Sequence, residues 1–306
     1  MAERERQIWR IVDVLKWSRD YLKGKQIESP QIEAEWILRE VLNLNRLEIY
    51  LKYERPLSPT ELARIKALLL KRASGQPIQY VLGSAEFMGL KLKVTPDVLI
   101  PRPETELLVE KTLELCRNRV TARILDIGTG SGCIAIALAH FLPECQVVAI
   151  DISATALQIA RANAAIHNVA NRIDFQELDI LHSPELSMGQ FDIIVSNPPY
   201  VSGDYYVNLP KLVKEHEPEI ALNPGTDGLL FYRRIRELAS KIAIPGGAVV
   251  LEIGGDYQAT AVAELFSESA FDSVAIVKDY SGQSRVIIAE LAKLKICLPI
   301  LKLCVL

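Results

Sequence analysis

Apolar residues recur with a helical period over residues 3–73, and this spacing stops near residue 74. Ser29-Pro30 predicts the start of one helix, because serine is a favoured N-cap and proline a favoured first helical residue. Ser58-Pro59-Thr60-Glu61 predicts a capping box at the start of another. Residues 1–74 are therefore expected to form a small helical bundle, either a partner-binding module or a stabilising extension.

The pattern changes after this segment. Glycines and prolines interrupt short apolar runs over residues 75–101, and we expect the runs at 78–82 and 90–94 to be strands. This pattern predicts a β-hairpin linking two domains. Over residues 102–290, short apolar runs alternate with helical segments, and we expect seven strands between residues 123 and 290. This alternation predicts an α/β fold with a seven-stranded, doubly wound, Rossmann-like domain. The connection over residues 201–226 is long and polar, which is typical of functional or disordered loops.

A polar turn follows the apolar run at residues 191–195, which we expect to be a buried central strand. Asn197-Pro198-Pro199-Tyr200 ends this strand, because proline has no N–H for the ladder. Open α/β sheets bind ligands at the carboxyl ends of their strands. The Asn197 side chain and the carbonyls around the prolines are acceptors that suit an –NH2 group, and Tyr200 offers a flat face. The turn predicts a clamp for a planar amide or an amino-substituted base. On these residues alone, a strand-ending turn with a surface tyrosine explains the pattern equally well.

A glycine-rich loop follows the expected strand at residues 124–127. Gly128-Thr129-Gly130-Ser131-Gly132 lacks the last glycine of a dinucleotide fingerprint, because Cys133 occupies that position. The acid Asp151 ends the next strand, where it suits a ribose diol. Together they favour a nucleoside cofactor without a pyrophosphate, such as S-adenosylmethionine. Asp179 follows the next strand, where it could accept a hydrogen bond from an adenine amino group or simply be a solvated aspartate in a turn.

One further stretch carries charge at the start of a helix. Arg102-Pro103-Glu104-Thr105-Glu106 places acids in the first helical turn, where the helix dipole favours them. The dipole does not explain Arg102, so Arg102 and Glu104 are candidates for a loop at the site.

Composition excludes several classes of protein. The net charge of −3 argues against a general nucleic-acid binder. Residues 1–75 carry 15 Lys+Arg and 11 Asp+Glu, so this part is mildly basic and suits an acidic partner. The five cysteines and four histidines show no metal-ligand spacing, so we expect no metal site and a reducing cytoplasm. We also expect no signal peptide and no membrane span.

The stretch from about residue 75 to residue 290 resembles the release factor glutamine methyltransferases, the PrmC/HemK family. The resemblance rests on these matching stretches: Glu86-Phe87-Met88-Gly89, Leu99-Ile100-Pro101-Arg102-Pro103-Glu104-Thr105-Glu106, Asp126-Ile127-Gly128-Thr129-Gly130-Ser131-Gly132, Ser196-Asn197-Pro198-Pro199-Tyr200, Glu217-Pro218, Thr226-Asp227-Gly228-Leu229 and Glu252-Ile253-Gly254. The helical amino terminus fits the small domain of that family.

The resemblance implies an activity and its partners. A methyl group would pass from S-adenosyl-L-methionine to the side-chain amide nitrogen (N5) of the glutamine in the Gly-Gly-Gln motif of peptide-chain release factors, leaving S-adenosyl-L-homocysteine. Residues 1–74 would bind this substrate. We expect a cytoplasmic monomer that binds no nucleic acid directly.

The resemblance also implies residue roles. Gly128, Thr129, Gly130, Ser131, Gly132 and Asp151 would hold the methionine part and ribose of the cofactor. Asp179 and Ile180 would lie beside the adenine, although family members often have an aromatic residue at the position of Ile180. Asn197 and the Pro198 carbonyl would bind the glutamine amide, with Pro199 shaping the turn and Tyr200 packing against the amide. Asn197, Pro198 and Tyr200 are the expected catalytic residues.

Three other interpretations stay open. The Asn-Pro-Pro-Tyr turn also resembles that of enzymes that methylate the exocyclic amine of a nucleic-acid base, such as adenine N6, after flipping it. A sister family methylates a glutamine of a ribosomal protein, although its Arg-Pro-Glu-Thr-Glu stretch is usually different. A non-catalytic binding module is the third interpretation. The apolar tail at residues 291–306 fits none of these roles.

Overall fold

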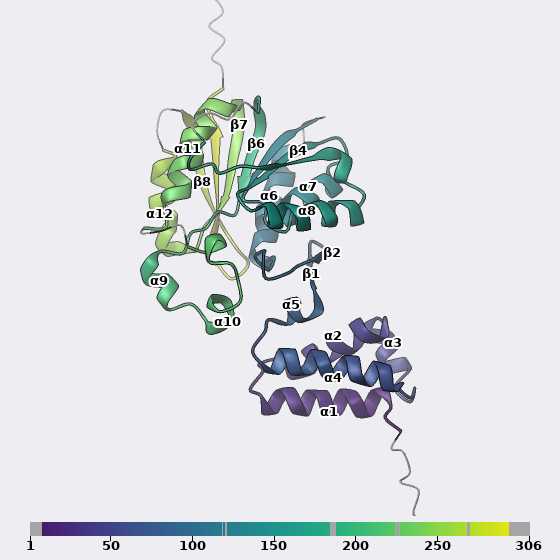
Figure 1. The fold of residues 1–306 in the computed structure, drawn as a ribbon. Coiled ribbons are helices and arrows are strands. Elements are labelled where there is room, and N and C mark those ends of the chain that lie inside the picture. The colour runs from purple at the N-terminus through teal and green to yellow at the C-terminus, as the bar shows by residue number, and fades with distance from the viewer. Residues whose placement is uncertain are drawn as a thin grey trace, which may run out of the picture. The chain divides into compact units, whose positions relative to one another are not determined.

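The computed structural model describes residues 8–117, 119, 121–183, 188–223, 225, 227–267 and 270–293. These residues form two compact units (Figure 1). The first contains the residues up to Ser84 and Pro210–His216, and the second contains Ala85–Leu209 and the residues from Glu217 onward. The division therefore falls inside the segment that we expected to be a linker.

The first unit is helical, as the sequence predicts. Its helices are α1 (Ile11–Gly24), α2 (Pro30–Leu42), α3 (Arg46–Leu51), α4 (Pro59–Ala73), α5 (Ile78–Leu82) and α10 (Lys211–Lys214). The apolar faces of α1 to α5 share one buried core. Ser58 and Glu61 form the expected capping box at the start of α4. Ser29 lies at the N-cap of α2, but its side chain makes no capping hydrogen bond.

An ion pair is buried inside this unit. Arg72 Nε donates to Glu33 Oε2 at 2.5 Å, and Arg72 Nη2 donates to Glu33 Oε1 at 3.1 Å. Arg72 Nη1 also donates to the Gln76 carbonyl. Since both carboxylate oxygens are satisfied by the planar guanidinium, the pair fixes α2 against α4.

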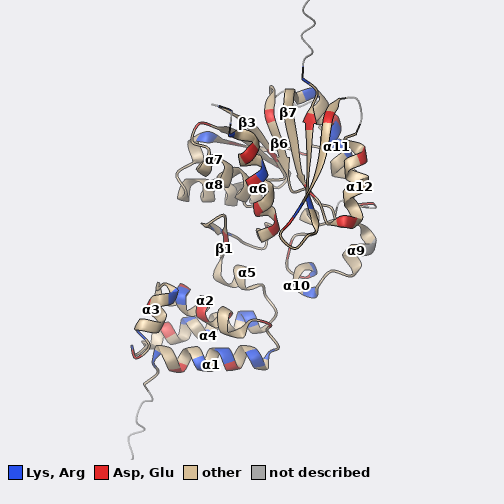
Figure 2. Ribbon diagram, turned by 180° about the vertical axis from the view of Figure 1, so that it is seen from behind, with Lys and Arg blue, Asp and Glu red and all other residues tan. Residues whose placement is uncertain are grey.

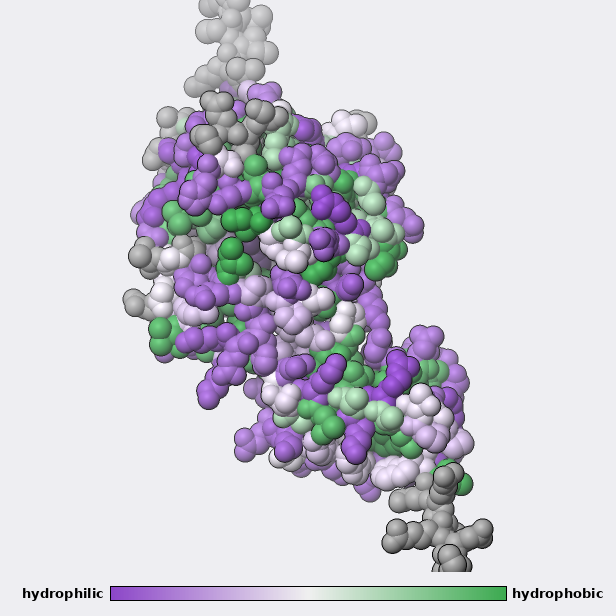
Figure 3. Space-filling model, viewed as in Figure 1, coloured by the Kyte–Doolittle hydropathy of each residue, from purple (hydrophilic) through white to green (hydrophobic). Residues whose placement is uncertain are grey.

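The surface of the first unit mixes charged and apolar side chains. Along α1, the acids Asp13 and Asp20 stand among basic residues (Figure 2). Several large apolar side chains of this unit are exposed: Trp17, Ile32, Trp36, Leu47, Leu51 and Leu70. Figure 3 shows hydrophobic residues among hydrophilic ones on one face of the unit.

The second unit is built on a seven-stranded sheet of order β5-β4-β3-β6-β7-β9-β8. Its strands are β3 (Arg123–Ile127), β4 (Gln146–Asp151), β5 (Ile173–Glu177), β6 (Phe191–Ser196), β7 (Ala243–Glu252), β8 (Phe271–Lys278) and β9 (Ser284–Leu291). Strands β3 to β7 are parallel, and β9 runs antiparallel to both β7 and β8. The chain moves outward from β3 to β5 and then returns to β6, so β3 and β6 flank the topological switch point.

Helices cover both faces of this sheet (Figure 1). One face packs against α6 (Pro103–Cys116), α7 (Cys133–Phe141) and α8 (Ala154–Ile166). The other packs against α11 (Leu230–Ile242) and α12 (Asp256–Leu265). Neighbouring strand residues enter opposite cores, as the pleat requires. The predicted doubly wound α/β fold is confirmed.

A short hairpin precedes the sheet. Strands β1 (Ser84–Phe87) and β2 (Leu90–Lys93) are joined by Met88 and Gly89, both with positive φ. The hairpin packs on the α8 side of the sheet, where Asn163 exchanges hydrogen bonds with the Lys93 backbone. Our prediction of strand for the run at 78–82 was wrong. It forms α5, because Ile78 and Val81 are buried at helical spacing in the first unit's core.

Two other segments differ from expectation. The connection over residues 201–226 contains α9 (Gly203–Val207), α10 and the 3-10 turn η2 (Glu219–Ala221). Elsewhere in the second unit, the 3-10 turn η1 (Ala170–Arg172) precedes β5. Our prediction placed the start of the apolar tail one residue too early, because Leu291 still belongs to β9. Residues 294–306 of that tail lie outside the described residues.

Candidate active site

A cavity of about 340 Å³ opens at the carboxyl ends of β3, β4 and β6. Eight of the residues singled out from the sequence line it: Gly128, Gly130, Asp151, Asp179, Ile180, Asn197, Pro198 and Pro199. Six others do not line it: Arg102, Glu104, Thr129, Ser131, Gly132 and Tyr200. The fold therefore collects the two predicted ligand-binding segments in one cavity.

The glycine-rich loop offers bare backbone to this cavity. Gly128 and Gly130 have φ values of +73° and +55°, and a Cβ built on either would meet no atom within 4 Å. The Gly128 and Thr129 N–H groups donate to the Ile150 carbonyl, which ties the loop to the end of β4. The space beside these two glycines is therefore open to the close approach of a ligand.

The other loop residues serve the fold. A Cβ on Gly132 would lie 2.9 Å from Ile136 Cδ1 and 3.1 Å from Ala160 Cβ, so this glycine allows α7 to pack against α8. The Thr129 hydroxyl donates to Asp126 Oδ2 at 2.7 Å. Asp126 is fully buried, which raises the pKa of its carboxyl to about 7, and its Oδ1 has no partner among the described residues.

Asp151 joins the loop to the next segment. Its Oδ2 accepts from the Gly130 N–H at 2.8 Å, and its Oδ1 accepts from the Ser153 N–H at 2.9 Å. Burial raises the pKa of this carboxyl, while its backbone donors lower it in part. Each carboxylate oxygen can accept more than one hydrogen bond, so Asp151 still suits a diol.

The segment after β5 forms a further wall. Ile180 is 4% exposed and contributes apolar surface. Asp179 Oδ1 accepts from the Leu181 N–H, and Asp179 Oδ2 pairs with His182 Nδ1 at 2.6 Å. The hydrogen bond from His182 lowers the pKa of Asp179. Asp179 thus organises its own turn and also borders the cavity.

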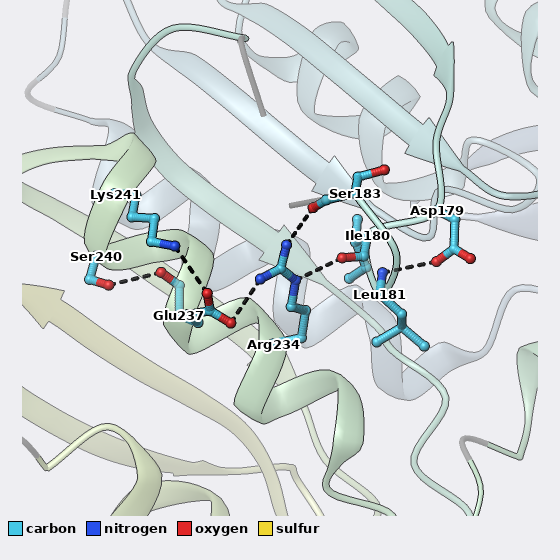
Figure 4. Close-up of polar contacts among 8 residues, drawn as sticks. All are labelled: Asp179, Ile180, Leu181, Ser183, Arg234, Glu237, Ser240 and Lys241. Carbon is cyan, nitrogen blue, oxygen red and sulfur yellow. Dashed lines mark hydrogen bonds and ion pairs between the residues drawn. The ribbon is translucent and has the colours of Figure 1, made fainter. Parts of the chain in front are cut away.

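Arg234 of α11 holds this wall, as Figure 4 shows. Its Nε donates to the Ile180 carbonyl at 2.7 Å, and its Nη2 donates to the Ser183 carbonyl at 2.5 Å. Its Nη1 pairs with Glu237, which Lys241 also contacts. The sequence analysis missed Arg234, because nothing in the local sequence distinguishes it from neighbouring arginines.

Asn197 lies where β6 ends. The Ser196 hydroxyl donates to the Ile127 carbonyl at 2.7 Å, which fixes this end of β6 to β3. Asn197 Nδ2 donates to Thr105 Oγ1 at 3.2 Å. Since the amide nitrogen is engaged in this way, the side-chain oxygen is what Asn197 offers to a ligand.

Tyr200 packs behind the turn rather than along the cavity. Burial raises the pKa of its phenol, which therefore stays neutral. Gln258 Nε2 contacts the carbonyls of Tyr200 and Gly228 at 3.4 and 3.0 Å. A Cβ on Gly228 would lie 2.6 Å from the Tyr200 carbonyl oxygen, so only glycine fits there without displacing the turn.

Arg102 has a partner far along the chain. Its Nη2 donates to Glu217 Oε1 at 2.5 Å, and the Ile100 N–H donates to Glu217 Oε2 at 3.4 Å. The Glu217 side chain is 2% exposed. This contact explains the arginine that the helix dipole could not, and it anchors the chain that leads into α6.

The described residues contain neither a candidate membrane-spanning helix nor a candidate metal-binding cluster. Among them, no helix combines the length and apolar character needed to cross a bilayer. In the same part of the chain, no group of three or more His, Cys, Asp or Glu side chains is arranged to hold a metal ion.

Solved structures confirm the fold. The chain is similar to a methyltransferase from Pyrococcus furiosus, with a TM-score of 0.51, 21% identity, and coverage of 74% of this chain and 98% of that one. It is also similar to the hMettl16 catalytic domain solved with a MAT2A 3′UTR hairpin, with a TM-score of 0.55, 17% identity, and coverage of 78% and 84%.

Sequence comparisons identify the family. Residues 13–83 match the PrmC N-terminal domain, and residues 103–216 match the methyltransferase small domain. The release factor glutamine methyltransferase of Geobacter sulfurreducens is 42% identical over 92% of this chain and 96% of its own length. That of Chlorobaculum tepidum is 40% identical over 92% and 97%. The chain therefore belongs to the release factor glutamine methyltransferase family.

Proposed function

We propose that this enzyme methylates the N5 atom of the glutamine in the Gly-Gly-Gln motif of peptide-chain release factors, with S-adenosyl-L-methionine as methyl donor. One observation supports this most directly: Asn197 and Pro198 line the same cavity as Gly128, Gly130 and Asp151. A pair of amide acceptors thus lies beside a wall suited to a nucleoside.

The residues present fit the cofactor. The open backbone at Gly128 and Gly130, the Asp151 carboxylate and the apolar Ile180 wall would hold its methionine, ribose and adenine parts. When bound, S-adenosyl-L-methionine supplies an electrophilic methyl group on a sulfonium. Thr129, Ser131 and Gly132 support the loop from behind rather than contact the ligand.

The turn suits an amide nucleophile. An amide nitrogen is a poor nucleophile, because its lone pair is delocalised into the carbonyl. The Asn197 side-chain oxygen and the Pro198 carbonyl accept from its two N–H groups, orient the nitrogen and favour its more pyramidal form. Positioning and oriented dipoles of this kind account for much of the rate of such reactions.

No strong base is required for this transfer. Methyl transfer to the neutral amide nitrogen leaves a positively charged, N-protonated amide, which is strongly acidic and loses its proton to water. Tyr200, whose buried phenol stays neutral, packs behind the turn and supports the acceptors.

The helical unit, together with its linker, is the substrate-docking part in this proposal. Its mildly basic composition and exposed apolar side chains, such as Trp17 and Trp36, suit a protein partner. The enzyme would act as a cytoplasmic monomer on its protein substrate without contacting nucleic acid.

Mass spectrometry tests the proposal. Release factor is incubated with the enzyme and S-adenosyl-L-methionine, beside a control release factor whose Gly-Gly-Gln glutamine is replaced by glutamate. We expect one methyl group on that glutamine and none on the control. An unmodified glutamine, with cofactor binding shown separately, would contradict the proposal and redirect the search to a ribosomal protein or a nucleic acid.

A further inference from the structure

Two buried polar residues close to the Asn197 turn have no role in the mechanism above. Thr105, in the first turn of α6, is 2% exposed, and Glu252, the last residue of β7, is 1% exposed. Neither side chain lines the cavity. Burying a hydroxyl and a carboxyl costs free energy, so their contacts need an explanation.

The contacts form a relay that ends at Asn197. Asn197 Nδ2 donates to Thr105 Oγ1 at 3.2 Å. Leu251 pairs with Ser196 in the sheet, so Glu252 follows on beside the turn, and the Thr105 side chain lowers the pKa of its carboxyl. Glu252 Oε2 has no partner among the described residues. The three residues come from α6, the end of β6 and the end of β7, so the tertiary fold alone brings them together.

The chemistry of these groups fixes the direction of each bond. An ionised carboxylate only accepts, so we expect the single Thr105 hydroxyl hydrogen to point toward Glu252. Thr105 Oγ1 is then available as an acceptor toward Asn197. An acceptor at that place selects the NH2 end of the Asn197 amide and turns its oxygen away from Thr105. With the hydroxyl hydrogen reversed, the flipped amide would present N–H groups to the substrate's own N–H groups.

We propose that Thr105 and Glu252 are positioning residues that set the orientation of the Asn197 amide, so that its oxygen faces the substrate N–H. This inference rests on the proposed function, since it assumes that Asn197 accepts from an amide. Partners that orient a contacting residue commonly change activity by about 10- to 100-fold when removed.

Ionisation of Glu252 gives the relay a pH dependence. Burial raises its pKa to about 7, and the Thr105 side chain lowers it in part. Other ionisable groups also act on or face this carboxyl: Arg285, Glu104, Arg102, Tyr200, Tyr232 and Cys133. A protonated Glu252 can donate to Thr105 and free the hydroxyl hydrogen to point at Asn197. Turnover should therefore fall as the pH drops below about 7.

A matched pair of variants tests the relay. Thr105→Val removes the hydroxyl at nearly constant shape, and Thr105→Ser keeps it. We expect Thr105→Val to lower kcat about 10- to 100-fold, with Kd for S-adenosylhomocysteine within about twofold of wild type. Thr105→Ser should return kcat to within about threefold of wild type. Equal kcat for Thr105→Val and wild type would overturn the inference.

A double-mutant cycle separates positioning from a general structural effect. If Thr105 acts through Asn197, Thr105→Val should not lower the residual kcat of Asn197→Ala any further. The same fold-loss in both backgrounds would contradict the relay. Full turnover in Asn197→Ala would instead contradict the proposed function, whatever the result at Thr105.

Glu252→Gln supplies a second measurement that does not depend on the folding of the Thr105 variants. Glutamine keeps an acceptor but does not titrate. We expect the fall in kcat below about pH 7 to disappear in this variant, because the ionisation that causes it is gone. An unchanged pH profile would overturn the role of Glu252.

Discussion

Gly128, Gly130 and Asp151 border the cavity from two neighbouring strands with one helix between them, and the backbone itself makes most of their contacts. Asn197 borders the same cavity but is held by Thr105, which lies 92 residues away in the sequence. The side of the cavity formed by the glycine-rich loop and Asp151 is therefore assembled locally, whereas the side formed by Asn197 depends on the tertiary fold. We expect changes on the glycine-loop side to alter cofactor affinity and changes on the Asn197 side to alter the rate of methyl transfer.

The largest effect should come from Asn197→Ala. Removing one of two amide acceptors should lower turnover about 100- to 1000-fold, because oriented dipoles act mainly on the transition state. Binding of S-adenosylhomocysteine, measured by calorimetry, should stay within about twofold of wild type. A large loss of cofactor affinity in this variant would contradict the division of roles between the glycine-loop side and the Asn197 side of the cavity.

Asp151→Ala should show the converse. It removes the acceptor of the Gly130 and Ser153 N–H groups and the candidate diol acceptor. We expect Kd for S-adenosylhomocysteine to rise about 10- to 100-fold, as for other hydrogen bonds to charged groups. Turnover at saturating cofactor should change by less than about threefold. For Asp151→Asn, which keeps one acceptor oxygen, Kd for S-adenosylhomocysteine should lie between the values for wild type and Asp151→Ala.

Arg234→Met should have a smaller effect of the same kind. The variant loses the bonds to the Ile180 and Ser183 carbonyls, so the apolar wall becomes less ordered. We expect Kd for S-adenosylhomocysteine to rise about fivefold, or about 1 kcal/mol, with kcat unchanged. Arg233→Met is the control, because that side chain is exposed and pairs with Asp227. Equal effects at both positions would show that only the charge of α11 matters.

A separate effect concerns stability and its dependence on pH rather than turnover or cofactor binding. The pKa of Asp126 is about 7 in the folded protein, above its usual value of about 4. A carboxyl whose folded pKa is raised contributes stability below about pH 4 and loses that contribution as the pH rises through about 7. Asp126→Asn does not titrate, so its Tm relative to wild type should increase between pH 5 and pH 8.

The control for this measurement is Asp174→Asn, a change at an exposed acid on β5. Its Tm difference from wild type should stay constant over the same pH range. A constant difference for Asp126→Asn as well would show that the buried carboxyl is not the source of the slope.

Local patterns in the sequence were enough for the sheet, the glycine-rich loop and the Asn-Pro-Pro-Tyr turn. Each depends on neighbouring residues: an apolar run, a glycine spacing, or a proline that ends a strand. The run at 78–82 was misassigned, because five residues between turn formers are too short to separate a helical period from a strand.

The contacts that the sequence did not predict all join residues far apart in the chain. Arg102 stood out from the helix dipole, but its partner Glu217 lies 115 residues away. Thr105 was within a matching stretch, yet its bond to Asn197 exists only because α6 and β6 meet in the fold. Arg234 had no local signal at all. Sequence patterns therefore identified the groups facing the cavity better than the groups that hold them.

Gly228 has a consequence for how this protein can evolve. A side chain at this position would meet the backbone carbonyl of Tyr200 at 2.6 Å, and no change of another side chain can remove a backbone atom. A substitution at Gly228 therefore has no compensating partner that is one mutation away. Drift can change many surface positions of the protein, but we expect position 228 to be closed to it as long as the turn is under selection.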